Sequence, residues 1–578
     1  MKLFERKNYK IFFKSKGEPI LWLTAGGLMM SLVMIFFLLF LVVKNGFLNF
    51  WPLDITQFEL KNGGKLMGEI TQVQEYKFPS DKLSALDELS AKRIQDNEGF
   101  EKRYLLRIGN FELTNEHFRW VSENEIANTS HPKQAVIIER LEWGRFYGFP
   151  KAFMLDGEKV ASEGPEIWVN FQKYYAEARK LWKEKVKVEK IDIGKLNHEI
   201  EKERLKLKKA QIDLEKAKFS KNSEEVKKAE ARLSVVKAEF DKFSVKSDEA
   251  YKRLVDRVSE LRSSYEKYSI LFETSSGEMK DVKLYEMVRI YNANQLDFWG
   301  RLKIYFSRWV EFLFDEPREA NSEGGVFPAI FGTVVMTLIM SIFVVPFGVV
   351  TSIYMKEYAR TGYVLSILRI AINNLAGVPS IVYGVFGVGF FAYTLGGRID
   401  ELFYSAKLPN PTFGTGGILW SSLTLALLTL PVVIVATEEA INAVPNSLRE
   451  GSYACGATKW QTIRHIVIPR ALPGIMTGFI LAMSRGAGEV APLMLVGAVK
   501  LAPEMPVDGI FPFVHLERSF MHLGFHIYDL GFQSQNSDAS IPMVYTTTLL
   551  LIAIVVTLNV AAIYIRSRLR KKFIGSVF

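Results

Sequence analysis

The chain has 578 residues, a formal net charge of +10 and one cysteine, Cys455, which excludes an intramolecular disulfide. Its basic residues flank apolar runs or are spread along a helical region, which favours membrane orientation over nucleic-acid binding. Hydrophobic residues make up 48% of the chain and cluster in long runs, so we expect a mainly α-helical, polytopic membrane protein. We expect Cys455 to be a small, packed helix residue.

The first apolar run, residues 19–43, follows a basic segment, residues 1–18. It carries no charge and is long enough to cross about 30 Å of hydrocarbon once. A cleaved signal peptide is the alternative, but the run exceeds the usual apolar region of about 7–15 residues and no small-residue cleavage site closes it. We therefore predict a first membrane helix with a cytoplasmic N-terminus.

Residues 44–323 contain no run apolar enough to span, so this topology places them in the periplasm. Within residues 44–164, short pieces alternate polar and apolar residues, and Asn62, Gly63 and Gly64 form a hairpin signal between two of them. This pattern predicts a small β or α+β domain.

Residues 165–275 show heptad repeats on both sides of a polar break at residues 220–223. The repeat positions hold Ile193, Ile200, Leu207 and Leu214 before the break, and Val226, Leu233, Phe240, Leu254, Leu261 and Tyr268 after it. Two apolar seams joined by a turn predict an antiparallel coiled-coil hairpin with solvated Lys and Glu faces. At about 1.5 Å per residue, it would project about 70 Å into the periplasm.

The connector, residues 276–323, includes an aromatic stretch at 295–314 that also holds Arg301, Lys303 and Arg308. We expect a helix in the membrane interface anchored by Trp299 and Trp309. A packed amphipathic helix of the periplasmic domain is the alternative.

Residues 324–578 contain five further spans. We place them at 324–355, 371–397 (with an earlier start near residue 364), 408–437, 471–498 and 540–565. Six spans in total put both termini in the cytoplasm, in agreement with the basic C-terminal segment. The same topology puts the loop at 445–469 in the cytoplasm.

The sequence of that loop predicts two short capped helices that are joined at a glycine. The capping pairs are Ser447 with Glu450 and Thr458 with Gln461. Gly456 is expected to end the first helix in a left-handed conformation, and Pro469 to end the second. Such a shaped loop predicts a docking surface.

One pattern in this loop resembles the EAA loop of ABC-importer permeases. It consists of EGS at 450–452, three residues, Gly456, nine residues and IVIP at 466–469. Gly451 and Ser452 stand where the family pattern has alanine, and Ile468 where it has leucine. In that family the loop contacts a cytoplasmic ATPase. The resemblance therefore assigns coupling to Glu450, Gly451, Ser452, Gly456, Ala457, Thr458, Ile466 and Pro469.

Three segments resemble PstA-type permeases of the bacterial phosphate-specific transporter. They are NNLAGVPSIVYGVFG (373–387), LREGSYACGATKWQTIRHIVIPRALPGIMTG (448–478) and RGAGEVAPLMLVGA (485–498). The resemblance covers residues 323–578. It implies a type I (MetI-like) core that forms half of a pore for inorganic phosphate in the inner membrane. It also implies three partners: a PstC-type permease, a PstB-type ATPase dimer and a PstS-type binding protein.

The sequence has no G-x-x-x-x-G-K-[ST] motif, so the ATP-binding motor is expected on a separate subunit, with its Mg. We expect this chain to bind no cofactor itself and to be no enzyme. Membrane lipid is its expected surroundings.

Two groups of polar residues inside the spans are candidates for the substrate pathway. Arg485 lies about 14 residues, or about 21 Å, into its helix, with Glu489 one turn on. Its planar guanidinium suits a tetrahedral oxyanion. The alternative is an ion pair that only holds the helix in the bundle.

Arg369, with Asn373 and Asn374 one turn later, is the second candidate, and Ser380 offers a hydroxyl. The alternative for Arg369 is snorkelling toward cytoplasmic headgroups.

Three other features favour structural interpretations. His515, His522 and His526 lack a zinc-binding pattern, the glycine-rich segment at 413–417 is better explained as a turn than as a phosphate cradle, and Glu438 and Glu439 are expected to be solvated. Two rival functions stay open: a permease for another oxyanion such as sulfate or molybdate, and a membrane-anchored coiled-coil scaffold or sensor.

Overall fold

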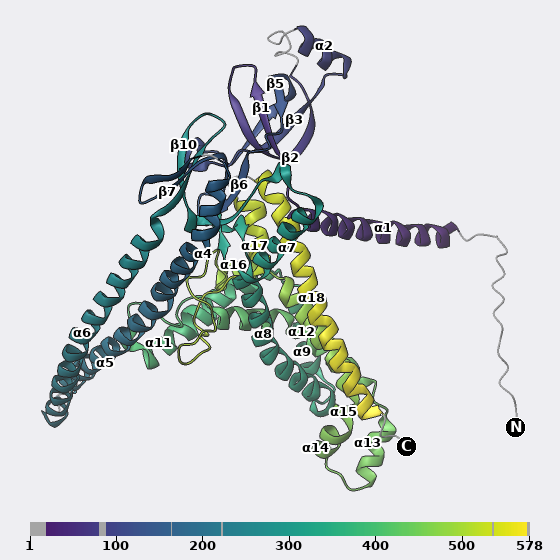
Figure 1. The fold of residues 1–578 in the computed structure, drawn as a ribbon. Coiled ribbons are helices and arrows are strands. Elements are labelled where there is room, and N and C mark those ends of the chain that lie inside the picture. Colours follow the sequence, from purple (N-terminus) through teal and green to yellow (C-terminus); the bar gives the residue numbers. More distant parts are fainter. Residues whose placement is uncertain (1–18, 80–87, 163, 221–222, 535–536, 575–578) are drawn as a thin grey trace.

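The computed structural model describes residues 19–79, 88–162, 164–220, 223–534 and 537–574. Figure 1 shows a β-rich module at one end of a helical bundle, and a long helical hairpin that extends from the module. The N-terminal segment 1–18 lies outside the described residues.

The first sheet of the module has five antiparallel strands in the order β4-β3-β2-β1-β5. They are β1 (Ile55–Leu60), β2 (Lys65–Lys77), β3 (Phe100–Arg107), β4 (Phe118–Ser122) and β5 (Ile126–Ser130). The predicted hairpin signal at Asn62–Gly64 joins β1 to β2, and Gly63 has the positive φ of +83° that such a turn requires. Two short helices, α2 (Glu88–Asp96) and α3 (Phe111–Thr114), lie between its strands.

The second sheet combines strands from both sides of the hairpin in the order β10-β9-β7-β6-β11, with β8 also paired to β7. They are β6 (Val136–Arg140), β7 (Arg145–Leu155), β8 (Glu158–Ser162), β9 (Tyr268–Glu273), β10 (Met279–Lys283) and β11 (Met287–Tyr291). Ile270 and Phe272 of β9 are fully buried against Phe146 and Phe153 of β7. The hairpin is therefore an insertion within one sheet. Tyr268, assigned to the hairpin by its heptad position, instead begins a strand.

One arm of the hairpin is formed by α4 (Pro165–Lys187), a π-helical segment η3 (Val188–Ile193) and α5 (Gly194–Phe219), and the other by α6 (Ser223–Glu266). The predicted turn includes residues 221–222, which lie outside the described ones. Lys208 of α5 donates a hydrogen bond to the carbonyl of Leu408, directly after η9 (Ser405–Lys407) of the bundle. Beyond the module the hairpin diverges from the bundle toward its tip (Figure 1). The expected projection into the periplasm stays a prediction.

The helix α7 (Phe298–Phe314) links the module to the bundle. One face buries Arg308, Glu311 and Phe312, whereas Trp299 and Phe314 on the other face are 72% and 68% exposed. Both interpretations of this segment are therefore met in part: α7 packs on the module and presents an apolar face outward. The strand pair β12 (Pro317–Arg318) and β13 (Glu323–Gly324) follows it.

Six helices among the described residues are long and apolar enough to cross a membrane. They begin with α1 (Pro19–Leu48) and α8 (Phe327–Ile353), continue with the run α10 (Ser380–Phe386), η8 (Gly387–Gly396) and α11 (Gly397–Phe403), and end with α12 (Ile418–Asn442), the run through α15 (Ile468–Gly488), and α18 (Ser537–Ile574). The predicted number of spans is confirmed.

Three predicted span boundaries are wrong, and one of them is the end of the span expected at 471–498, which lies at Gly488. The expected span at 371–397 is divided, because Gly377 and Pro379 separate a shorter helix, α9 (Tyr363–Ala376), from α10. The span expected from residue 408 begins at Ile418, since the preceding residues form a loop that wraps the carboxylate of Asp400. Buried hydroxyls within the spans, such as those of Thr333 and Thr337, bond to carbonyls four residues back, which satisfies them without an outside partner.

Candidate functional site

The first helix of the 445–469 loop is α13 (Asn446–Ala454), and it begins immediately after Pro445. The predicted Ser447–Glu450 capping box is wrong, because the helix starts two residues earlier than a cap at Ser447 requires, and it has no side-chain cap. Proline fits this boundary because its fixed φ leads the chain into the helix. Its missing N–H costs no hydrogen bond, since a backbone N–H at a helix start has no partner within the helix.

Arg449 ties this helix to the ends of two spans. Its guanidinium donates to the carbonyls of Val444 (2.6 Å) and Ile441 (2.9 Å) in and after the last turn of α12, and pairs with Glu357 (3.1 Å). Glu357 belongs to η7 (Tyr354–Tyr358), the π-helical continuation of α8. A cation at a helix C-terminus is favourable. No local pattern reveals this link, because its partners are far away in the sequence.

The joint between the two loop helices forms as expected. Gly456 has φ +81°, and the following amide of Ala457 bonds to the carbonyl of Ser452 (3.2 Å). Thr458 and Gln461 form the complete predicted capping box at the start of α14 (Lys459–Thr462). These two local predictions are confirmed.

Pro469 does not end the second helix, so that prediction is wrong. The chain continues from α14 through the π-helical η10 (Ile463–Val467) into α15. A proline ring clashes with the carbonyl four residues earlier in a regular α-helix, and a wider turn relieves that clash. The loop is consequently continuous with a membrane span, and Ile466 lies within the π-helical turn.

The loop has one packed face and one open face. Ile463 and Val467 are fully buried against Ile353, Ile441 and Val444 from the ends of α8 and α12. On the open face, Tyr453 and Trp460 are 42% and 53% exposed, and Glu450, Gly451 and Gly456 are exposed as well. Cys455 is also exposed, in contrast to the packed position expected, because it falls at the C-cap of α13.

Arg485 lies in the last turn of α15, which ends at Gly488. Glu489 follows in extended backbone, and its carboxylate is 3.4 Å from the Arg485 Nε. The expected pair is therefore formed across a helix end rather than along one helix face. The two side chains are 38% and 22% exposed, so neither is sealed in the chain's own core. Beyond the break, α16 (Ala491–Val496) begins with Pro492 in its first turn.

Arg369 is paired with Glu438 at 2.5 Å. Both line a cavity of about 280 Å³ between α9 and α12, together with Asn373 and Glu439. The expectation that Glu438 is merely solvated is wrong, since its side chain is only 18% exposed. Arg485 does not line this cavity, so the structure keeps the two predicted arginine groups apart.

The remaining candidates lie close to the break between α9 and α10. The carbonyl of Asn374 accepts a hydrogen bond from Gly377, and Ser380 is the first residue of α10. The hydroxyl of Tyr383 donates to the carbonyl of Leu375 (2.6 Å), which fixes the angle between the two helices. These contacts are structural.

The glycine-rich segment at 413–417 forms a turn, and its amides already hold an anion from the same chain. The backbone amides of Thr412, Phe413 and Gly414 donate to the carboxylate of Asp400 at 2.7–3.0 Å. Asp400 is 1% exposed. This internal use of the amides explains why the segment is not a phosphate cradle.

The three histidines do not converge on a metal, and the described residues contain no group of three possible ligands. His515 pairs with Asp508 (3.0 Å), whereas His522 accepts a hydrogen bond from the amide of Gly524. Burial lowers the pKa of His522 and His526 to about 4. Both are therefore neutral at pH 7.

Residues 344–573 match the sequence profile of a family described as binding-protein-dependent transport system inner membrane component. This range includes the 445–469 loop and both arginine groups. Residues 344–573 are therefore similar to the permease domains of this family. The predicted fold, a mainly α-helical membrane protein with a permease core, is thereby confirmed for this part of the chain.

Two curated relatives illustrate the similarity of this chain to known proteins. A probable ABC transporter permease protein, YqgH of Bacillus subtilis, is 35% identical over 34% of this chain and 62% of its own length. The phosphate transport system permease protein PstA 1 of Mycobacterium tuberculosis is 41% identical over 30% of this chain and 52% of its own length. The match thus spans little more than half of each relative, and the resemblance of the permease domain to the PstA type is confirmed.

Among solved structures, the inward-facing MetNI methionine ABC transporter is similar at 20% identity, covering 42% of this chain and 94% of its own, with a TM-score of 0.29.

Proposed function

We propose that this chain is a permease subunit of an ATP-driven importer of inorganic phosphate in the bacterial inner membrane, and that it forms half of the pore. A separate PstB-type ATPase dimer would bind ATP and Mg, a PstC-type permease would complete the pore, and a PstS-type protein would deliver phosphate. This chain would contribute no catalysis of its own. Both termini would be cytoplasmic and residues 44–323 periplasmic.

The construction of the 445–469 loop carries the proposal. Its open face offers Glu450, Tyr453 and Trp460 to a partner, and its packed face is locked to the ends of α8 and α12. Because Arg449 bonds to both span ends, a push on the loop moves the spans rather than bending a flexible connection. A transmitter of motion needs this stiffness.

The exposed side of the permease domain supports a second membrane subunit. Val364, Ile367 and Ile370 of α9, and Val385 of α10, are 56–72% exposed although they are strongly apolar. Lipid or another apolar chain must cover such a surface. The half-open Arg485–Glu489 pair supports an anion pathway completed by that subunit, because charged groups inside a membrane face polar cavities.

The proposal can be tested with the complete complex in proteoliposomes. We expect the double variant Glu450→Ala, Trp460→Ala to lower phosphate uptake and phosphate-stimulated ATP hydrolysis by about tenfold or more, since exposed anchor residues of an interface typically cost 2 kcal/mol or more. Glu401→Ala, an exposed glutamate in α11, is the matched control and should leave both rates unchanged.

Two outcomes would contradict the proposal. Uptake that is inhibited by sulfate but not by excess unlabelled phosphate would show that the substrate is another oxyanion. Normal uptake by the double variant would show that the loop does not couple the ATPase.

A further inference from the structure

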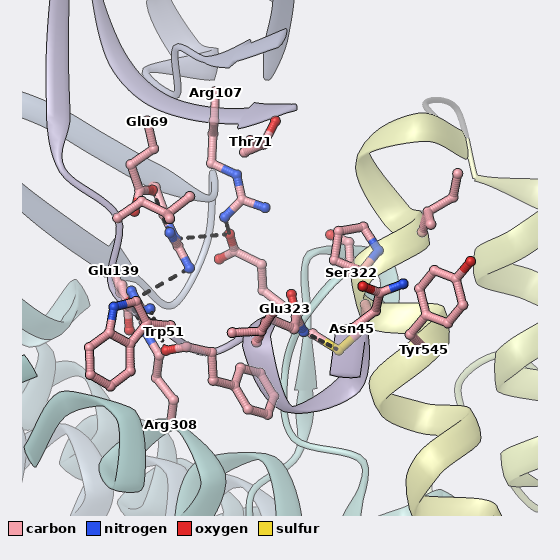
Figure 2. A pocket seen from close by; sticks show the side chains of 18 of the residues that line it. Asn45, Trp51, Glu69, Thr71, Arg107, Glu139, Arg308, Ser322, Glu323 and Tyr545 are labelled. Carbon is pink, nitrogen blue, oxygen red and sulfur yellow. Dashed lines mark hydrogen bonds and ion pairs between the residues drawn. The ribbon is translucent and has the colours of Figure 1, made fainter. Parts of the chain in front are cut away.

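A cavity of about 530 Å³ lies where the module meets the membrane bundle. Strands β2, β3, β6 and β7 form one side of it, together with α7, and the ends of α1 and α18 form the other. Figure 2 shows Arg107 and Glu323 on the strand side and Asn45 and Tyr545 on the helix side. Cavities of this volume accommodate small organic ligands.

The strand side carries four guanidinium groups and four carboxylates, and three of the carboxylates form short ion pairs. Glu69 bonds to Arg145, Glu139 to Arg308 and Glu311 to Arg318. The fourth, Glu323, is shared by Arg107 and Arg145, each at 3.8 Å. A wall with balanced charge disfavours a multiply charged anion and suits a ligand with one negative charge or with both signs.

The guanidinium of Arg107 has unused donors, and the Nε of Arg145 beside it also lacks an acceptor. The side chain of Arg107 is 21% exposed, and within the described residues it makes no hydrogen bond. Its contacts are the long ion pair with Glu323 and the ring of Phe118 at 4.9 Å. A mostly buried charged donor without an acceptor is costly, so the cavity is suited to an oxyanion beside Arg107.

The opposite wall combines apolar side chains with the polar side chains of Asn45 and Tyr545, and it belongs to two membrane helices. Leu48 and Trp51 at the end of α1, with Ile541 and Pro542 at the start of α18, line it. The two helices are in close contact at Gly46, where an added Cβ would lie 3.0 Å from Leu549, and α1 then diverges from the bundle (Figure 1). Only 6% of the apolar span of α1 is buried, so its flank is open to acyl chains.

The exposed face of α7 places the cavity at headgroup depth. Trp299, Phe306, Val310 and Phe314 form an apolar stripe that is 59–72% exposed, while Arg308 and Glu311 on the other face line the cavity. A helix of this kind lies in the membrane surface with its apolar stripe in the lipid. A molecule in the cavity therefore has its polar end at the level of lipid headgroups.

We propose that the cavity binds one glycerophospholipid. Its phosphodiester accepts hydrogen bonds from Arg107, with Asn45 and Tyr545 as further donors, and its acyl chains leave between α1 and α18. Inorganic phosphate fits less well, because it would leave the apolar side chains of the opposite wall uncovered and bring more negative charge beside Glu323. The bound lipid joins the module to the bundle.

Native mass spectrometry of the full chain, released from nanodiscs that contain bacterial phospholipid, tests this site. The wild type should retain one phospholipid. Arg107→Gln should lower the retained fraction by about tenfold or more, because the loss of a hydrogen bond to a charged group costs at least that factor. Tyr545→Phe, which keeps the ring, should give a smaller loss. Arg103→Gln, an exposed arginine on the same strand, is the matched control.

A photo-crosslinking phospholipid provides the second measurement and should label residues 45–53 and 541–545. Equal lipid retention by the wild type, Arg107→Gln and Tyr545→Phe would overturn the proposal, as would crosslinks confined to other parts of the chain. Displacement of the lipid by millimolar inorganic phosphate would overturn it in favour of a phosphate site. Thermal unfolding of each variant shows whether it is folded. If a variant is misfolded, the positions of the crosslinks in the wild type decide whether the lipid occupies the cavity.

Discussion

Single arginines hold the parts of this protein together at positions that their local sequence does not mark. Arg308 of α7 is buried and donates to the carboxylate of Glu139 in β6, the carbonyl of Phe50 after α1, and the hydroxyl of Tyr291 in β11. Arg449 likewise joins the 445–469 loop to the end of α12, because it donates to the carbonyls of Val444 and Ile441. The planar fork of arginine reaches several acceptors at once, which makes each such residue a junction between elements.

The Arg308–Glu139 junction leads to a pH-dependent prediction. Burial alone would raise the pKa of Glu139, but the guanidiniums of Arg308 and Arg289 outweigh it and hold the pKa below its usual range. Glu139 therefore stabilises the folded module fully above its unfolded pKa of about 4.3, and this contribution is lost as the pH falls below that value. Glu139→Gln should cost about 3–5 kcal/mol at pH 7, because it leaves buried guanidiniums unpaired.

Thermal unfolding of the full chain in detergent at pH 7 and at pH 3.5 measures this effect. The difference between wild type and Glu139→Gln should be large at pH 7 and smaller at pH 3.5, where the wild-type contribution is partly lost. Glu75→Gln is the matched control, since Glu75 forms only an exposed, 4.0 Å ion pair with Lys102. A difference that stays constant with pH would contradict the pKa argument.

At the scale of elements, the 445–469 loop shows which structural features are specified by neighbouring residues in the sequence. The Thr458–Gln461 box and the left-handed Gly456 depend on neighbouring residues, and both were predictable. The start of α13 and the passage of the helix through Pro469 were not, because they depend on packing of Ile463 and Val467 against other spans. The π-helical turns η7, η8 and η10 likewise have no simple sequence signature.

Two glycines of this loop give opposite predictions. Gly456→Ala places a side chain at φ +81°, which costs about 1–2 kcal/mol although the space around it is open. This change should distort the joint and lower phosphate-stimulated ATP hydrolysis of the complete complex severalfold. Gly451→Ala lies within α13, also in open space, and should stabilise the helix by about 0.5–1 kcal/mol with activity retained. Equal loss of activity in both variants would show that the loop surface, rather than the joint, is sensitive.

At the scale of the whole molecule, the sequence predicted the number of spans but not the connectivity of the module. The heptad pattern placed Tyr268 in the helical hairpin, yet that residue begins β9. Strands before and after a long helical insertion pair only because their apolar residues meet in three dimensions, as Phe146 and Phe272 do. Similarly, nothing near Arg107 or Tyr545 indicates that the two residues line one cavity.

This connectivity decides how the role of the hairpin can be tested. Removal of residues 165–275 would delete β9 and expose the core of the second sheet, so a loss of transport would reveal nothing about the hairpin itself. Asp213 and Arg232 face each other across the hairpin at 3.5 Å, so removal of residues 209–236 with a replacement loop of about four residues keeps the arms in register. The contact of Lys208 with Leu408 is also preserved.

The shortened chain should fold and transport phosphate within about twofold of the wild-type rate, because the buried clusters of the bundle contain no hairpin residue among those described. Uptake by proteoliposomes and thermal unfolding provide the measurements. A scaffold whose coiled coil does the work requires the opposite result, in which removal of the tip abolishes function while the loop variants at Glu450 and Gly456 have no effect. The tip deletion and the loop variants together thus separate a permease with an accessory hairpin from a hairpin with an accessory membrane anchor.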